Sequence, residues 1–248
     1  MDNPGYIALS RLVAQNRATA VLAHNMANAE TPGFRASRPV FADHLERQRQ
    51  ARTAPGGESL HFAQDRATWR DDSPGAVQTT GNPLDIAISG EGLFSVQTPR
   101  GERYTRAGRF SLGPEGTVVD AEGNALLDTG GNPLRVAPND VRLTIRGDGT
   151  LLSENGEIGK IRISRFAQPQ RLVAEGDRLL AAGEGQAPEA IERPALVQGA
   201  LEGSNVRPVV ELTRLTAEMR EFQFMAQFAE KEGERISGAV ERILRKRG

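Results

Sequence analysis

Apolar and polar positions near the C-terminus follow a helical pattern. Between Leu212 and Ile243, apolar or small residues recur at alternating steps of three and four, which keeps one stripe on one side of a helix. A helix of roughly 35 residues is about 50 Å long, too long to lie on a compact domain of this size. The pattern therefore predicts a partner helix, either at the chain's own N-terminus or in other copies. The stripe consists of Leu212, Leu215, Met219, Phe222, Ala226, Ala229, Gly233, Ile236, Val240 and Ile243.

The first residues predict a second, shorter helix from about Tyr6 to Ala29. Its stripe has the same spacing, is rich in alanine, and includes Asn16, a polar residue that favours one register in a helical seam. Thr31-Pro32-Gly33 ends the helix, because proline disfavours helical geometry in its predecessor and glycine permits a left-handed turn. The stripe consists of Tyr6, Leu9, Val13, Asn16, Ala20, Ala23 and Ala27.

The middle of the chain changes to the period-two pattern of strands. Short alternating runs are separated by glycine-containing turns such as Gly147-Asp148-Gly149 and Glu154-Asn155-Gly156. Short strands spaced by such turns predict an antiparallel, partly rolled β domain, and a parallel sheet is disfavoured because no long helix intervenes. The strand-like runs are 84–88, 93–96, 116–119, 142–145 and 161–164.

The predicted fold class is α+β, with N- and C-terminal helices forming a coiled-coil-like α domain around a central antiparallel, partly rolled β domain. Leu45–Gln50 could form a short helix inside a connector that orders only against its neighbours. Ser204 or Asn205 is a candidate cap for the C-terminal helix, near Pro208. The predicted segments are the N-terminal helix at 1–33, an extended connector at 34–77, the β domain at 78–197, and the C-terminal loop and helix at 198–248.

Composition and charge exclude several classes of function. The 31 basic residues nearly balance the 32 acidic ones, so no global field attracts nucleic acid or an anionic membrane. There is no cysteine, which excludes thiol catalysis, disulfides and thiolate metal sites. No run approaches about 18 apolar residues, so we expect no membrane insertion. The first residues lack a basic segment followed by an apolar one, so we expect no cleaved secretory signal.

No residue pattern predicts catalysis. His24, His44 and His61 are dispersed without metal-ligand spacing, and no pair of carboxylates stands out as an acid–base dyad. We therefore expect no enzyme activity, no metal and no cofactor, and a function in protein interaction. One alternative is a dimeric binding module whose β domain recognises a ligand. A glycan-acting enzyme is a further alternative, but it lacks an acid–base pair.

Three sequence blocks resemble bacterial flagellar rod and hook proteins. They are the segment 23–35, with the motif Thr31-Pro32-Gly33-Phe34; the segment 80–94, continuing at 104–110; and the segment 197–208. His24 and Met26 depart from the usual asparagine and leucine of the first block. The signature residues are Asn25, Asn28, Thr31, Pro32, Gly33, Phe34, Gly81, Asn82, Leu84, Asp85, Gly199, Glu202, Ser204 and Asn205.

The resemblance implies a structural subunit of the basal-body rod, more like proximal-rod than distal-rod members because of its opening Met1-Asp2-Asn3. It also implies export through the flagellar type III apparatus without a cleaved signal, helical assembly with other rod subunits in the periplasm, and torque transmission. In such proteins the terminal helices form the inner core and the β domain the outer layer. The two apolar stripes would then form subunit interfaces.

Overall fold

The computed structural model describes residues 3–47, 59–176 and 178–245, which divide into two compact units. The helical unit contains the described residues of 1–27, 37–71 and 207–248. The β unit contains 28–36 and the described residues of 72–206. Each unit is therefore assembled from segments that are far apart in the sequence.

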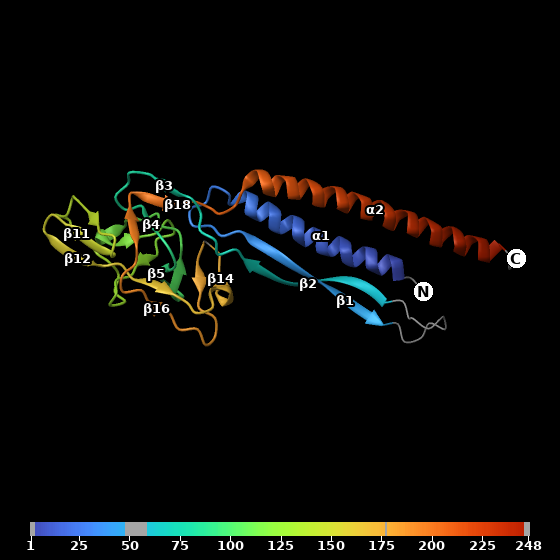
Figure 1. The fold of residues 1–248 in the computed structure, drawn as a ribbon, viewed down its shortest axis with the longest axis horizontal. Coiled ribbons are helices and arrows are strands. Elements are labelled where there is room, and N and C mark those ends of the chain that lie inside the picture. The colour runs from blue at the N-terminus through green and yellow to red at the C-terminus, as the bar shows by residue number, and fades with distance from the viewer. Residues whose placement is uncertain (1–2, 48–58, 177, 246–248) are drawn as a thin grey trace. The chain divides into compact units, whose positions relative to one another are not determined.

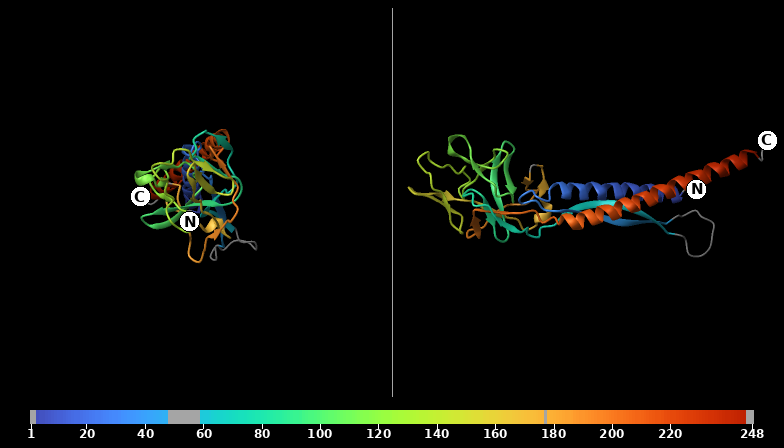
Figure 2. Two further views of the ribbon diagram at one scale, coloured as in Figure 1. Left: turned by 90° about the vertical axis from the view of Figure 1, so that its left-hand side faces the viewer. Right: turned by 90° about the horizontal axis from the view of Figure 1, so that it is seen from above.

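The helical unit consists of two helices and one β-hairpin. Helix α1 (Asn3–Ala27) and helix α2 (Pro208–Arg245) run side by side in opposite directions (Figures 1 and 2). Strands β1 (Ser37–Arg47) and β2 (Ser59–Arg70) pair antiparallel, and both pack against α1. At about 1.5 Å per residue, α2 is about 57 Å long and α1 about 37 Å, so α2 continues past the N-terminal end of α1.

The hairpin differs from the expected connector. The sequence predicts an extended segment at 34–77, with a helix at Leu45–Gln50 as one alternative. The described part of that alternative lies in β1, where Leu45 pairs with His61 and Glu46 with Leu60, so a helix is wrong there. Pairing with β2 satisfies the strand backbone, and α1 covers the hairpin, which the local sequence does not reveal. Residues 48–50 lie outside the described residues.

The β unit confirms the α+β class, since all of its strand pairs are antiparallel. Its largest sheet has the order β14-β15-β6-β5-β9-β8-β7, with β13 pairing β5 and β16. Smaller sheets are β10-β11-β12, β17-β4 and β18-β3. The strands are β3 (Val77–Thr79), β4 (Ile86–Ile88), β5 (Leu93–Thr98), β6 (Gly101–Thr105), β7 (Ser111–Leu112), β8 (Val118–Val119), β9 (Ala125–Leu126), β10 (Thr144–Ile145), β11 (Thr150–Ser153), β12 (Gly156–Lys160), β13 (Ile163–Arg165), β14 (Val173–Ala174), β15 (Leu180–Ala181), β16 (Glu189–Ala190), β17 (Leu196–Gln198) and β18 (Ala200–Glu202).

The predicted strand runs and turns are confirmed at their positions. Each of the five runs contains an observed strand, namely β4, β5, β8, β10 and β13. Glycine is required in the turns: Gly149, between β10 and β11, has φ +91°, and Gly156, the first residue of β12, has φ +137°. L-residues with a side chain rarely adopt such angles. Short one-turn 3₁₀ helices lie at Pro114–Gly116 and Pro169–Arg171.

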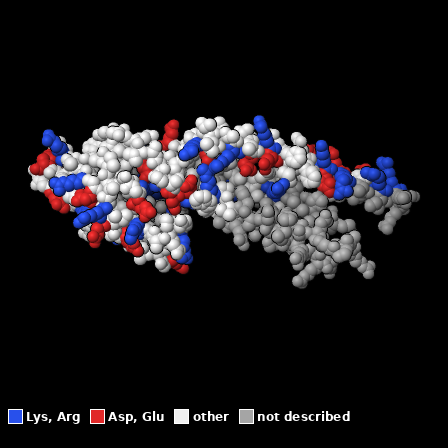
Figure 3. All heavy atoms as spheres, in the orientation of Figure 1, with Lys and Arg blue, Asp and Glu red and all other residues white. Residues whose placement is uncertain are grey.

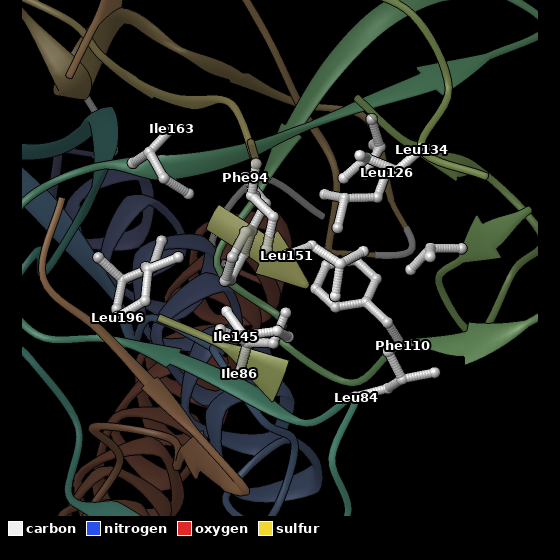
Figure 4. Packing of buried hydrophobic residues seen from close by; sticks show 14 of the residues in the cluster. Leu84, Ile86, Phe94, Phe110, Leu126, Leu134, Ile145, Leu151, Ile163 and Leu196 are labelled. Atoms are coloured by element: carbon white, nitrogen blue, oxygen red, sulfur yellow. The ribbon is translucent and has the colours of Figure 1, made fainter. Parts of the chain in front are cut away.

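The core of the β unit is formed by apolar side chains from several strands (Figure 4). Phe94 and Phe110 meet edge to face at 5.1 Å between ring centroids, a geometry that aromatic pairs prefer. A smaller cluster surrounds Tyr104 and Phe166, whose rings meet edge to face at 4.7 Å. Burial, together with the nearby negative charge of Glu102, raises the pKa of Tyr104 to about 12. Its hydroxyl is therefore protonated at neutral pH.

Candidate functional site

Helix α1 carries two stripes with the same spacing, and the chain buries only one of them. The buried stripe faces α2 and the hairpin and consists of Ala14, Gln15, Ala18, Val21, Leu22 and Asn25. The predicted stripe lies on the exposed side: Leu9 is 58% exposed and Val13 62%. Its other described members are also exposed, namely Asn16, Ala20, Ala23 and Ala27, while the side chain of Tyr6 lies outside the described residues. Their role in an interface stays a prediction.

Helix α2 is exposed over most of its length. Three members of its predicted stripe, Leu212, Met219 and Phe222, are 52%, 52% and 40% exposed. Phe224 and Phe228, which the prediction did not include, are exposed as well. The half-buried members are Leu215, Ala226, Ala229 and Ile236, and the side chains of Val240 and Ile243 lie outside the described residues.

Carboxylates occupy several of the more buried positions on α2. Glu211 is fully buried, and Glu218 and Glu232 are half-buried, at multiples of seven residues from it. Nη1 of Arg38 in β1 lies 2.7 Å from Oε1 of Glu211, and Nη1 of Arg214 lies 3.4 Å from the same oxygen. The covered face of α2 is therefore partly polar, which the apolar pattern alone does not predict.

Asn25 fixes the start of the hairpin to α1. Its side chain is fully buried, Nδ2 donates to the carbonyl of Ser37 at 2.9 Å, and Oδ1 accepts from the amide of Ser37 at 2.9 Å. Because the side-chain amide satisfies both backbone groups of one strand residue, it extends the pairing of β1. This explains physically why the first signature block needs an amide at this position.

The signature loop, residues 28–36, belongs to the β unit. Its turn is closed by hydrogen bonds from the Thr31 amide to the Asn28 carbonyl, and from the Thr31 hydroxyl to Oδ1 of Asn28, both 3.2 Å. Gly33 has φ +69°, and a Cβ added there would lie 2.5 Å from the Ala107 amide nitrogen. Only glycine fits this approach. The amide of Gly33 donates to the Glu202 carbonyl at 2.8 Å.

The Glu202 carboxylate is the polar centre of this site. It is 2% exposed and contacts Arg35 through Oε1 at 2.8 Å and Arg106 through Oε2 at 2.5 Å. Oε1 also accepts from the Gly75 amide at 3.0 Å. A buried carboxylate is tolerated only when it is paired and hydrogen-bonded in this way.

Arg106 is itself fully engaged. It is 5% exposed, and besides Glu202 its guanidinium donates to the backbone carbonyls of Ile88 (2.8 Å), Gly90 (2.6 Å) and Gly92 (2.5 Å). The Ile88–Gly92 segment therefore holds the guanidinium of Arg106 through three backbone carbonyls.

Asn205 joins the signature loop to the segment that contains Ser73. Its Oδ1 accepts from the Ala36 amide at 2.7 Å, and its Nδ2 donates to the Ser73 carbonyl at 3.0 Å. Ser204 Oγ accepts from the Val206 amide at 3.2 Å, before the first residue of α2. The predicted role of these two side chains was to cap α2. These hydrogen bonds instead order the loop that precedes α2.

The second and third signature blocks also meet. The amides of Thr80 and Gly81 donate to the Gly199 carbonyl at 2.7 and 3.0 Å, and the Gly199 amide donates to the Asp85 carbonyl at 2.8 Å. Asn82 Nδ2 donates to Asp85 Oδ1 at 3.1 Å. Leu84 is buried in the core. The structure thus brings these signature residues together as a framework for β3, β4, β17 and β18.

The sequence pattern does not predict the partners of the Glu202 carboxylate or the polar residues between the two helices. Arg35 and Arg106 lie inside the blocks that carry the resemblance, and that position was the only available signal. Gln15 and Arg38 gave no signal, because their partners Glu221 and Glu211 lie about 200 residues further on. His24 is exposed, while the side chains of His44 and His61 lie outside the described residues.

No group of three or more histidine and acidic side chains in the described ranges is placed to hold a metal ion. Neither described helix has a stretch that is long and apolar enough to cross a membrane.

Three family models match in chain order: "Flagella basal body rod protein" at residues 6–35, "Flagellar hook protein FlgE/F/G D1 domain" at 87–153, and "Flagellar basal body rod FlgEFG protein C-terminal" at 197–235.

Individual relatives agree with these matches. The chain is 34% identical to the flagellar basal-body rod protein FlgF of Caulobacter vibrioides, over 98% of both chains. It is 32% identical to FlgF of Salmonella typhimurium over 90% of this chain and 91% of the relative. It is 32% identical to the rod protein FlgG of Bacillus subtilis over 82% and 84%. The chain belongs to the flagellar basal-body rod protein family.

Proposed function

We propose that this chain is a structural subunit of the flagellar basal-body rod, at the proximal position that its similarity to FlgF proteins suggests. The partners are other rod subunits, added in a helical assembly in the periplasm. The family and the similarity to FlgF over nearly the whole chain support this proposal. A distal-rod position is the second possibility, because FlgG proteins are almost as similar.

The observation that carries the proposal is that apolar members of both predicted stripes are exposed. Leu9, Val13, Met219 and Phe222 are each at least 40% exposed. Contiguous exposed apolar surface marks an interaction site. Since these residues keep a three-four spacing along long helices, the partners that fit them are other helices, packed as in a coiled coil.

The mechanism is packing. Helices stacked along the rod would resist twisting, because many apolar contacts, each weak, must be broken together. Repeated heterologous contacts generate an open helical polymer. Torque would then pass through the helices, while the β unit would form an outer layer.

The route to the periplasm is part of the proposal. Rod subunits of this kind would pass unfolded through the flagellar type III export apparatus without a cleaved signal. A chain without cysteine avoids disulfide formation on that route.

Substitution in the α2 stripe tests the proposal. In a strain lacking the native gene, the variant Phe222→Asp should prevent motility and rod completion, because it places a charge in the helix interface. The β unit should keep its fold, measured by thermal unfolding of the purified chain. Gln223→Asp, at the next and also exposed position, is the matched control and should support swimming. Normal motility of Phe222→Asp would contradict the proposal.

A further inference from the structure

The C-terminal part of α2, residues 229–245, carries its exposed acidic and basic side chains along two different edges. Each exposed glutamate there is followed directly by an exposed cation. Successive residues of a helix lie about 100° apart around its axis, while steps of three, four or seven residues return to the same side. A further cation, Arg245, ends the helix, where a positive charge complements the helix dipole. The acidic edge consists of Glu230, Glu234 and Glu241, and the basic edge of Lys231, Arg235 and Arg242.

Both edges lie on the outside of the helical unit. All six side chains are exposed, and both signs of charge are visible on this part of α2 in Figure 3. Among the described residues no side chain pairs with the acidic edge, while Arg235 binds the half-buried Glu232, with Nη2 2.6 Å from Oε1. Like charges lie four residues apart on each edge, Glu230 with Glu234 and Lys231 with Arg235, a spacing that destabilises an isolated helix. Opposite charges from outside the chain would stabilise both edges.

Apolar side chains continue both edges toward the start of α2. Phe224 and Phe228 precede Lys231 by seven and three residues, so they lie on the basic side, and they are 69% and 43% exposed. Met219 precedes Glu230 by eleven residues, which is close to three turns, so it lies on the acidic side; it is 52% exposed. Each edge is therefore apolar in its first part and charged in its second part.

We propose that α2 of one copy packs beside α2 of a second copy and parallel to it, with the acidic edge of one helix against the basic edge of the other. The inference rests on the proposed function, since it names the contact between neighbouring copies in the rod. In this arrangement opposite charges meet in the C-terminal part, and apolar side chains meet before it. Charged positions that flank a helical seam set partner and orientation in coiled coils in the same way. An antiparallel pair would place Phe224 and Phe228 against glutamates, which costs desolvation of the charges.

The pattern fits a second copy better than another occupant. The acidic edge has three negative charges and the basic edge three positive ones, so each copy supplies what the next one requires. An anionic partner would match the basic edge alone, and a cationic partner the acidic edge alone. Because the contact joins two different surfaces, it is heterologous and can repeat from copy to copy. The half-buried side chains of Leu215 and Met225 lie on the remaining side of α2, so the contact leaves the packing within the chain intact.

Exchange of neighbouring charges tests the contact. One variant reverses charges on the acidic edge (Glu230→Lys with Glu241→Arg), a second reverses charges on the basic edge (Lys231→Glu with Arg242→Glu), and a third carries all four substitutions. Arg235 is left unchanged because of its ion pair within the helix. Each variant is produced in cells lacking the native gene, and the amount of chain in isolated basal bodies is measured by mass spectrometry.

The combined variant is the matched control for the other two. Either single-edge variant should reduce the amount of chain about tenfold, because like charges would face each other across the contact. The combined variant restores opposite charges between copies and keeps the composition and net charge of the wild type, so its amount should return close to the wild-type amount. Thermal unfolding of the purified chains checks that all three variants fold. Normal amounts of the single-edge variants, or a combined variant that is no better than they are, would overturn the inference; the second result indicates a partner other than this chain.

Thiol cross-linking tests the direction of the two helices. Ser237 continues the acidic edge and Gly238 the basic edge, each three residues after the middle charge of its edge, and the chain has no cysteine. Cells that produce Ser237→Cys together with Gly238→Cys should give covalent dimers when basal bodies are treated with a short bismaleimide. Cells that produce either variant alone should give none, because two identical edges do not meet. Dimers from one variant alone, or no dimers from the pair, would show that the proposed contact is wrong.

The two proposals fail in different ways. If the wild-type chain is absent from basal bodies, the proposed function is wrong. If the wild-type chain is present and the single-edge variants enter in the same amount, only the contact between the two α2 edges is wrong.

Discussion

Nε of Arg106 lies 2.5 Å from Oε2 of Glu202, and both side chains are at most 5% exposed. Arg35 contacts the other oxygen of the same carboxylate. The Glu202 carboxylate therefore joins the signature loop to the rest of the β unit, and removing its charge leaves two arginines without their counter-charge.

Glu202→Gln should destabilise the β unit strongly. Loss of one partner of a buried ion pair costs about 3–5 kcal/mol, because the remaining charge is desolvated and unpaired. The free energy of unfolding, measured by urea denaturation, gives this difference directly. Glu189→Gln is the control: it breaks the exposed pair with Arg165 and should change stability by less than about 1 kcal/mol. Equal effects of the two variants would contradict the role of the buried carboxylate.

Gly33→Ala should destabilise the chain more than Gly123→Ala. Both glycines have positive φ, +69° and +87°, so both variants cost about 1–2 kcal/mol for the backbone. A Cβ at Gly33 would also lie 2.5 Å from the backbone of Ala107, whereas at Gly123 it meets nothing within 4 Å. The difference in thermal stability between the two variants gives the cost of the steric clash at position 33, because the cost of the positive φ is common to both. A smaller loss at position 33 than at position 123 would be the contrary result.

Asn25→Ala should loosen the hairpin from α1. The variant leaves the amide and carbonyl of Ser37 without their side-chain partners, at a cost of about 1–3 kcal/mol for the buried groups. Hydrogen exchange measured at the Ser37 amide should become faster, while exchange in β5 and β6 stays unchanged. Asn25→Asp keeps the acceptor and loses the donor, so it should protect the Ser37 amide better than alanine does.

Glu218 should make the helical unit more stable at acidic pH. Its pKa is raised in the folded chain, chiefly by burial, so the folded state binds this proton more tightly than the unfolded state. The free energy of unfolding contributed by this group therefore falls as the pH rises above its ordinary pKa of 4.5. Glu218→Gln should remove this decrease in the free energy of unfolding with rising pH. Unfolding of the helices is followed by far-UV circular dichroism. An identical pH dependence in both proteins would contradict the assignment.

The fold was predictable where local chemistry decides it. Glycines such as Gly149 and Gly156 mark turns whether or not the rest of the domain is known, so the strands beside them were placed correctly. The helices were found for the same reason, since their spacing is a property of the helix itself. The hairpin was missed because β1 and β2 are stabilised by each other and by α1, and neither strand has a clear signal alone.

The geometry of the candidate site could not be predicted from the sequence. The three-four spacing on α1 fits both Val13, which is exposed, and Ala14, which is buried. Periodicity shows which residues share one face of a helix, but it does not show which face packs against the rest of the chain. The sequence therefore could not tell which of the two stripes is buried. The pairing of Glu202 with Arg35 and Arg106 depends on contacts across more than 90 residues, which spacing does not encode.

Imaging the chain inside its assembly tests the central claim most directly. A cryo-electron microscopy map of isolated basal bodies should place copies of the chain in the rod, with Leu9, Val13, Met219 and Phe222 covered by helices of neighbouring subunits. A map in which the chain is absent from the rod, or in which these side chains face solvent, would contradict the account.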